Sequence, residues 1–438
     1  MGYLKSRLRM MMILQYAVWG IWMPILARYL QAPVDEGGLG FTVFQLGLIM
    51  GTAGSIGAIT APFIAGQIAD RYFSAERFMA VLLVLGGIVI FIMAGQTSFT
   101  AWVVLASLYS VLYMPTLALT NSISFANLKN PDMDFPLVRV FGGIGWIGAS
   151  WLFPMFWLQS DLTLQAMPPF FAGTEVVNAT GRLADALRIS GVMSILYAGY
   201  CFMLPPTPPK RDNVEPLAFK KAFALLKHPS FAWLVAASLP ISVIHQIYFV
   251  QTSPFFSQVL GIEDRYIGPA MTVGQFAELF IMAGLGLMLK SWGFRTTICI
   301  GGSAYVLRYA IFGMADSLPV GVVVASQALH GFCYACFFAA AYIYVDRIAS
   351  EDVRSSAQTV FGMVILGVGP MITSVALGLL AKIFPDGDGG IVFSSLWFTL
   401  SGVALVTTVI FGAFFRDETQ DKGEREDAAS TKREARIP

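Results

Sequence analysis

Charged residues are scarce in this chain of 438 residues, because they make up 13% of it, against about 25% in an ordinary soluble domain. Lys and Arg number 28 and Asp and Glu 27, so the chain lacks the net charge that would attract a nucleic acid. The four cysteines lie in apolar stretches, which indicates small core residues and no disulfide framework. These deficits exclude a typical soluble globular protein, a disordered chain and a nucleic-acid binder.

Motifs of familiar catalytic and metal centres are also missing from the sequence. It contains no P-loop, no HExxH, no GxSxG and no Cys/His metal spacing. An ATP-driven pump is therefore not expected. An embedded enzyme would need a clustered nucleophile and base, for which the chain offers His245, His330 and Glu278 at uninformative spacing. We expect a protein that is not an enzyme and that uses no cofactor and no metal.

Apolar sequence dominates instead, with 56% hydrophobic residues and a mean hydropathy of +0.68. A membrane-spanning helix takes ~20 residues, so twelve take ~240 and leave enough chain for loops and tails. Apolar runs separated by polar or Gly/Pro breaks predict an all-α polytopic membrane protein with twelve transmembrane helices. The predicted spans are 10–30, 43–69, 78–96, 99–126, 138–158, 186–206, 230–256, 267–289, 296–314, 319–345, 358–384 and 391–415.

A segment rich in proline and lysine divides these spans into two sets of six. The two sets also show an internal repeat at an offset of 220 residues, since Val140-Phe-Gly opens span five and Val360-Phe-Gly opens span eleven. Repeated halves are typical of large transporter families. The predicted domains are a six-helix bundle at 1–206, a cytoplasmic linker at 207–229, a second six-helix bundle at 230–415 and a cytoplasmic tail at 416–438.

The distribution of positive charge predicts the orientation in the membrane. With the N-terminus in the cytoplasm, 22 of the 28 Lys and Arg residues fall in cytoplasmic segments. Positive charge concentrates in the short cytoplasmic loops of membrane proteins. We therefore expect a multi-pass protein of the cell (inner) membrane, surrounded by lipid, with both termini in the cytoplasm.

Ionisable and polar residues inside a predicted span are candidates for function. Glu278 lies near the middle of span eight, where loss of water favours the protonated carboxyl group that proton coupling needs. Gln275 precedes it by about one helical turn and projects to the same side. Arg139 opens span five and either snorkels to the headgroups or turns inward, with Trp146 two turns further as a surface for stacking.

Spans seven, nine and ten carry the remaining candidates. In span seven, Gln246 offers both a donor and an acceptor to a base edge, and His245 either titrates or makes a neutral bond between helices. In span ten, His330 and Tyr334 lie on one polar face with Gln327. Arg308 in span nine needs a partner, either Asp316 or a carbonyl group, and we interpret it as structural.

One loop resembles a motif of the major facilitator superfamily. Gly66-x-x-x-Asp70-Arg71, with Arg77 beyond it, follows span two on the cytoplasmic side. Asp70 there can face the positive N-terminal end of a neighbouring helix, for which we favour span eleven, and so latch the two halves together. The alternative is a simple solvated turn. The resemblance implies the major facilitator fold, with two six-helix bundles.

Further residues resemble the nucleoside:proton symporter family. They are Tyr113-Met-Pro-Thr-Leu-Ala-Leu-Thr-Asn-Ser-Ile-Ser124, Asp134-Phe-Pro-Leu-Val-Arg-Val-Phe-Gly-Gly-Ile-Gly145, Gln275-Phe-Ala-Glu278 and Arg354-Ser-Ser-Ala-Gln358. The resemblance implies nucleoside uptake driven by a proton gradient, with Arg139, Gln246, Gln275 and Glu278 at the substrate cavity. The chain departs from the family at Gly143, at Phe249 and near Tyr334, where the family tends to carry a threonine, an amide and an acid, respectively.

We therefore predict a monomeric secondary transporter that imports nucleosides with protons by alternating access. The predicted substrate-binding residues are Arg139, Trp146, Gln246, Gln275, Glu278, His330 and Tyr334. The predicted proton-coupling residues are Glu278 and His245, and the predicted latch is Gly66, Asp70, Arg71 and Arg77. The alternatives are a symporter or facilitator for another polar solute, such as a sugar or a modified nucleoside, and a membrane-embedded enzyme or sensor.

Overall fold

The computed structural model describes residues 2–64, 73–166, 170–208, 224–349, 354–387 and 389–418. Ten helical segments within these ranges are long and apolar enough to cross a membrane. One of them, Asp264–Gly313, consists of two helices merged across Gly293, whose φ of 71° no continuous helix adopts. A further helix of 18 residues, Ala184–Cys201, carries Asp185 and Arg188 and is not among the ten. The helical membrane fold is confirmed, and the count of twelve stays a prediction.

The N-terminal half of the chain, residues 2–208, forms a helical bundle and a short antiparallel hairpin. In this hairpin Gln159 pairs with Glu175. Its elements are α1 (Gly2–Gly20), α2 (Met23–Gln31), η1 (Val34–Glu36), α3 (Val43–Leu46), η2 (Gly47–Ala53), α4 (Gly54–Phe63), α6 (Ala75–Met93), α7 (Phe99–Asn127), α8 (Pro131–Trp157), β1 (Gln159–Leu164), β2 (Phe171–Glu175), α9 (Ala179–Arg182) and α10 (Ala184–Cys201).

The C-terminal half, residues 224–418, has more helix breaks and a hairpin of two residues per strand. Its elements are η4 (Ala224–Lys227), α12 (Pro229–Gln258), α13 (Asp264–Gly313), η5 (Ala315–Ser317), α14 (Val320–Ala325), η6 (Ser326–Ala328), α15 (Leu329–Phe332), η7 (Cys333–Ala339), α16 (Ala340–Ile348), α17 (Arg354–Met363), η8 (Val364–Val368), α18 (Gly369–Ile383), β3 (Pro385–Asp386), β4 (Gly390–Ile391) and α19 (Phe393–Phe414).

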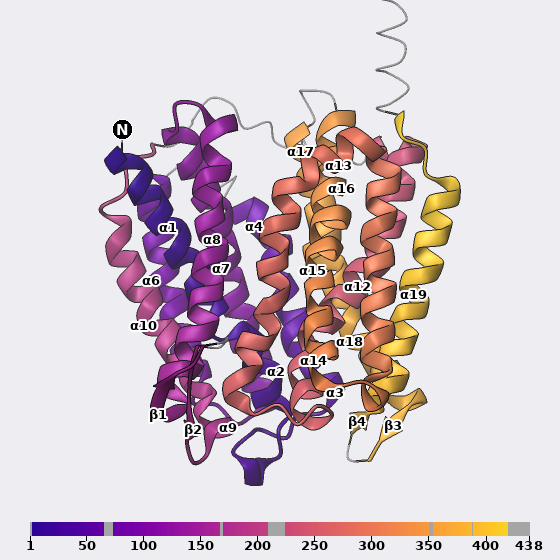
Figure 1. Cartoon of the computed structure of the whole chain (residues 1–438). Coiled ribbons are helices and arrows are strands. Elements are labelled where there is room, and N and C mark those ends of the chain that lie inside the picture. The colour runs from indigo at the N-terminus through magenta and orange to yellow at the C-terminus, as the bar shows by residue number, and fades with distance from the viewer. Residues whose placement is uncertain are drawn as a thin grey trace, which may run out of the picture.

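The two halves stand side by side as bundles of nearly parallel rods (Figure 1). The start of α1 and the end of α19 lie at one end of the molecule, called here the terminal end. Both hairpins lie at the opposite end, called here the hairpin end (Figure 1). The halves meet where α2 packs on α12, α8 on α13, and η2 on α18.

Within the described residues, the segments η2, η7 and η8 are π-helical and interrupt long helices. A π-helical turn disrupts the regular i→i−4 ladder and is found most often at functional sites. Pro370 lies two residues after the end of η8, in the first turn of α18, and a proline lacks the backbone N–H donor. All three segments face the interface between the halves, so the irregular backbone gathers where the site described below is formed.

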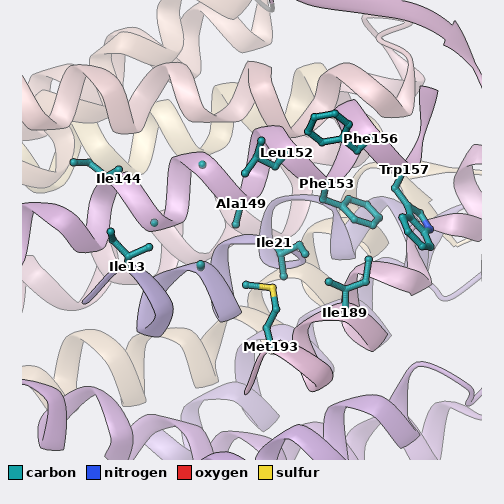
Figure 2. Close-up of a pocket in the computed structure, with 13 residues that line it drawn as sticks. Ile13, Ile21, Ile144, Ala149, Leu152, Phe153, Phe156, Trp157, Ile189 and Met193 are labelled. Atoms are coloured by element: carbon teal, nitrogen blue, oxygen red, sulfur yellow. The ribbon is translucent and has the colours of Figure 1, made fainter. Parts of the chain in front are cut away.

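Close contact between α1 and α8 depends on one of the glycines of α8. A Cβ atom built on Gly145 would lie 2.2 Å from the carbonyl oxygen of Ile13, whereas a Cβ atom on Gly148 would meet nothing within 4 Å. Gly148 instead lines an apolar groove of about 480 Å³ between α1, α8 and α10 (Figure 2). Gly145 therefore sets the distance between these helices, and Gly148 does not.

The predicted domain boundary and most of the predicted latch fall outside the described residues. The latch residues Gly66, Asp70 and Arg71 belong to the stretch 65–72, and the centre of the predicted linker lies within 209–223. Arg77 is described, and it is exposed in the first turn of α6. The domain division and the latch both stay predictions.

Candidate functional site

A cavity of about 530 Å³ lies between the two halves of the chain. Residues of α1, α2, η2, α7 and α8 line one side, and residues of α12, α13, α15, η7, η8 and α18 line the other. A volume of this size is typical of pockets for small organic ligands. The residues predicted from the sequence for substrate or proton binding all line it, namely Arg139, Trp146, His245, Gln246, Gln275, Glu278, His330 and Tyr334.

Glu278 is the acidic side chain among the described residues that line this cavity. Arg139, from α8 of the other half, is the charged residue that interacts with it electrostatically, but no contact within 4.0 Å joins the two described side chains. The Arg139 guanidinium lies over the ring of Tyr16 instead, 4.2 Å from its centroid. Of the two orientations considered from the sequence, the Arg139 side chain thus adopts the inward one. The Glu278 carboxylate therefore faces the Arg139 cation across the cavity without forming an ion pair with it.

The amides near Glu278 are used differently by the protein. Gln246 donates from Nε2 to the backbone oxygen of Met50 at 2.9 Å, which links α12 to η2 across the interface. Gln275 has no partner among the described residues for its buried Oε1 atom. A buried acceptor without a donor costs about 1–3 kcal/mol. Gln275 is therefore poised to accept a hydrogen bond from a ligand, whereas Gln246 is already partly occupied.

The two histidines of the cavity lie face to face, with ring centroids 5.5 Å apart and planes 14° from parallel. Nδ1 of His245 is 2.7 Å from the hydroxyl of Tyr305, and Nδ1 of His330 is 2.8 Å from Nη1 of Arg308. Phe249, where the resemblance leads one to expect an amide, packs edge-on against both histidines. This part of the wall is aromatic with two polar edges.

Aromatic side chains form a continuous ladder along the wall contributed by the N-terminal half. Neighbouring ring centroids lie 5.2–5.9 Å apart, in T-shaped or stacked arrangements that aromatic pairs prefer. The ladder runs through Trp146, Trp19, Tyr113, Tyr109 and Trp22. The cavity thus has an aromatic wall on one side, and on the other side a wall in which the polar groups of His245, Gln246, Gln275, Glu278 and His330 lie among apolar side chains.

Within this ladder, Trp146 alone was predicted from the sequence as a substrate-binding residue. Trp146 Nε1 is buried and has no partner among the described residues, and the buried Tyr109 hydroxyl and Trp22 Nε1 have none there besides each other. The missed residues do carry a signal, because Trp19 and Trp22, and likewise Tyr109 and Tyr113, are spaced three or four residues apart and share a helical face. Spacing could have indicated an aromatic face, but not that it faces a cavity.

A buried ionic cluster closes the interface at the hairpin end. Arg28 donates from Nε to Asp264 at 2.9 Å and from Nη2 to Glu36 at 2.8 Å, and its backbone N–H donates to Ser253 at 3.2 Å. Thr180 donates to the second oxygen of Asp264 at 2.5 Å. This hairpin-end cluster joins α2 and α9 to α12 and α13, and so ties the two halves together.

The hairpin β1–β2 extends this closure outside the membrane spans. Glu175, the last residue of β2, accepts a hydrogen bond from the backbone N–H of Arg265 at 3.1 Å. Burial raises the pKa of the Glu175 carboxyl, and the Arg265 bond opposes that shift in part. The Arg265 side chain also donates to the backbone oxygen of Gly173. Contacts between β2 and Arg265, at the start of α13, therefore oppose opening at this end.

Comparison with known proteins gives one family. The sequence model of a family described as Nucleoside H+ symporter matches residues 2–420. A xanthosine permease of Escherichia coli (strain K12) is 29% identical over 93% of this chain and 95% of its own length. The nucleoside permease NupG of the same organism is 26% identical over 94% of this chain and 96% of its own.

The fold matches a solved transporter closely. The crystal structure of a single-residue variant of the nucleoside transporter NupG superposes with a TM-score of 0.81. The two chains are 24% identical, and the match covers 94% of this chain and all of the other. The described helices therefore adopt the major facilitator type of fold that the sequence motifs imply.

Proposed function

The chain belongs to the nucleoside H+ symporter family, and from this we propose that it imports nucleosides together with protons by alternating access. The family and the relatives are transporters and not enzymes. The observation that carries the proposal is the cavity between the halves, which is lined by Glu278, Gln275 and Arg139 from both sides of the interface. Alternating access requires such a site at a boundary that opens to each side of the membrane in turn.

We propose that both termini face the cytoplasm and that the protein works as a monomer in the cell (inner) membrane. The terminal end then is the cytoplasmic end, which agrees with the excess of Lys and Arg in the segments assigned to it. The hairpin-end cluster then closes the outer side. In this state the site communicates with the cytoplasm more readily than with the exterior.

We assign the roles of the cavity residues from their chemistry. Glu278 takes up a proton on the acidic side, and the neutral acid and Gln275 then hold the hydroxyl groups of the ribose. Arg139 compensates the carboxylate when the proton leaves toward the cytoplasm. Trp146, within the aromatic ladder, provides a face on which the base stacks. His330 and Tyr334 complete the polar side, and His245 takes part in proton coupling or holds the base.

The test is uptake of radiolabelled nucleosides into proteoliposomes with an imposed pH gradient. We expect Glu278→Gln to abolish accumulation against the nucleoside gradient while exchange of nucleoside across the membrane persists. Asp316→Asn, which changes an exposed carboxylate outside the cavity, is the matched control and should accumulate normally. Accumulation that survives Glu278→Gln would refute the coupling role.

A second candidate is a symporter or facilitator for another polar solute. Phe249 favours it, because this side chain fills the cavity wall and packs against both histidines where an amide is expected. A thermal-shift screen over nucleosides, free bases and sugars separates the two candidates. Stabilisation by sugars or bases alone would favour the second.

A further inference from the structure

Arg308 is a buried cation whose surroundings are unusual. Its side chain is fully buried in the second part of α13, and no carboxylate lies within 4.0 Å of it among the described residues. Asp316, a partner considered from the sequence, is exposed and makes no such contact. The guanidinium lies 4.0 Å from the ring centroid of Tyr248 and 5.1 Å from that of Tyr309. The described contacts that remain are polar and neutral.

The shortest of those contacts is to His330. Nη1 of Arg308 lies 2.8 Å from Nδ1 of His330, while Nη2 lies 3.4 Å from the Tyr309 hydroxyl. A guanidinium carries donors and no acceptor, so Nδ1 of His330 must be the acceptor in this bond. A histidine that accepts at Nδ1 is neutral and carries its hydrogen on Nε2. Arg308 therefore selects one tautomer of His330 and excludes the doubly protonated form.

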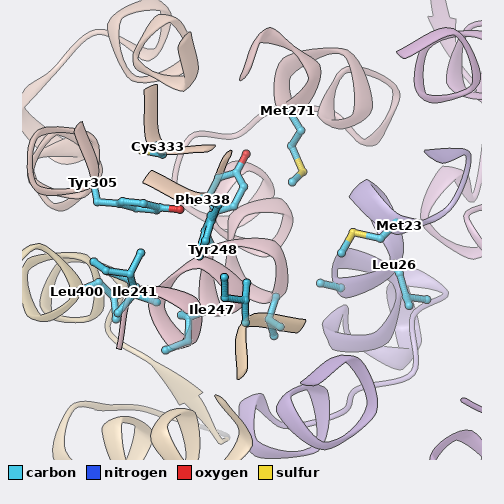
Figure 3. Close-up of a cluster of buried hydrophobic side chains, with 14 of the residues drawn as sticks. Met23, Leu26, Ile241, Ile247, Tyr248, Met271, Tyr305, Cys333, Phe338 and Leu400 are labelled. Carbon is cyan, nitrogen blue, oxygen red and sulfur yellow. The ribbon is translucent and has the colours of Figure 1, made fainter. Parts of the chain in front are cut away.

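The Nε2–H group has no partner among the described residues, although His330 lines the cavity and is 2% exposed. The ring belongs to an aromatic cluster, because it stacks on His245 and on Tyr248 at centroid distances of 5.5 and 5.3 Å, and those two rings lie 6.4 Å from each other. Figure 3 shows Tyr248, Tyr305 and Phe338 converging in this core. A fixed donor is thus offered to the cavity, where an acceptor of a bound ligand can meet it.

We propose that Arg308 is a positioning residue that fixes His330 as a hydrogen-bond donor to the base of the nucleoside. A base with an oxygen at this edge, as in inosine, then satisfies Nε2–H. A base with an amino group there, as in adenosine, opposes donor to donor. The aromatic surroundings suit a planar base, whereas Glu278 and Gln275 suit hydroxyl groups. This inference rests on the proposed function, since it concerns which nucleoside the same site prefers.

The first experiment measures the ratio of KM for adenosine to KM for inosine. We expect a ratio of about ten in the wild type, since a mismatched buried hydrogen bond is costly. In Arg308→Met the His330 ring is free to change tautomer, so the ratio should fall toward one. His330→Gln keeps an N–H group near the position of Nε2 and should retain the preference, whereas His330→Leu should lose it. An unchanged ratio in Arg308→Met overturns the proposal.

The second experiment reads the tautomer directly and does not depend on transport. The chain has three histidines, so selective 15N-histidine labelling gives a spectrum that can be assigned by replacing one residue at a time. We expect His330 to show an unprotonated Nδ1 and a protonated Nε2 from pH 5 to pH 8. A protonated Nδ1 would overturn the proposal even if Arg308→Met fails to fold. If no nucleoside is transported but this tautomer is found, the proposed function fails, and with it the role of His330 toward a base, whereas the control of the His330 tautomer by Arg308 stands.

Discussion

The hairpin-end cluster should hold the outer side of the transporter closed, and Asp264→Asn tests this. Asp264 is 4% exposed and receives hydrogen bonds from Arg28 and Thr180, which belong to the other half of the chain. Asparagine keeps the size of the side chain and one acceptor, but it removes the charge. We expect the state that is open to the outside to become more populated.

The size of the effect follows from the contacts that remain. Removing one partner of a buried ion pair costs ~3–5 kcal/mol when nothing compensates the other charge. Glu36 remains bonded to Arg28, and the asparagine oxygen can still accept, so we take about 2 kcal/mol, which corresponds to a roughly 30-fold change in the ratio of closed to open states.

Access of a thiol reagent to the cavity from outside the cell measures this ratio. Leu26 lines the cavity two residues before Arg28, so Leu26→Cys provides the target in a background without the four native cysteines. A membrane-impermeant maleimide added to intact cells should label this cysteine at least tenfold faster when Asp264→Asn is present. Asp185→Asn is the matched control, because Asp185 pairs with Arg188 within one half, and it should leave the rate unchanged.

Unchanged labelling in a folded Asp264→Asn protein would refute the closing role of the cluster. A double-mutant cycle with Arg28→Gln provides a second criterion, because residues that interact directly give non-additive effects. If the labelling rates of the two single variants simply multiply in the double variant, Arg28 and Asp264 do not act together.

Two further variant pairs test packing and the aromatic ladder. Gly145→Ala should lower the free energy of unfolding by ~1–3 kcal/mol, because the new Cβ atom meets the α1 backbone, whereas Gly148→Ala should be neutral or slightly stabilising. Thermal unfolding in detergent measures both effects. Equal melting temperatures of the two variants would contradict the packing argument. Tyr109→Phe should raise KM for nucleoside about 2- to 10-fold with little loss of stability, since the neighbouring Trp22 indole is the one described partner of its hydroxyl. Tyr113→Phe should instead lower the melting temperature, because that hydroxyl donates to the Gln15 backbone oxygen at 2.5 Å. A lower melting temperature for Tyr109→Phe, with KM unchanged, would exclude Tyr109 as a ligand contact.

Much of the architecture could be predicted because it depends on local properties of the chain. Long apolar runs determine membrane helices, since the bilayer permits no exposed backbone polar group. Glu278 was recognisable as a functional candidate for the same reason, because a carboxylate inside such a run is rarely tolerated without a role. Arg139 and Gln275 lie in motifs that resemble those of the family, and Gln246 was recognisable as a polar residue within an apolar run.

The contacts between helices could not be predicted in this way. Arg28 and Asp264 are 236 residues apart in the chain, and both lie near the ends of apolar runs, where charged residues are ordinary. We expected Asp316 or a carbonyl group as the partner of Arg308, but helix packing places His330 beside it instead. Tyr109 and Trp22 were not identified from the sequence, because only helix packing places them against the cavity between the halves.

What the sequence by itself determined is the membrane class of the protein, its family and the polar residues that the membrane-spanning runs contain. Each of these rests on composition or on spacing within one helix. Only the tertiary structure decided which polar atoms find partners and which remain free toward the cavity. Hydrogen bonds and ion pairs act over a few ångströms, so they depend on how helices that are remote in the chain are rotated and packed against one another.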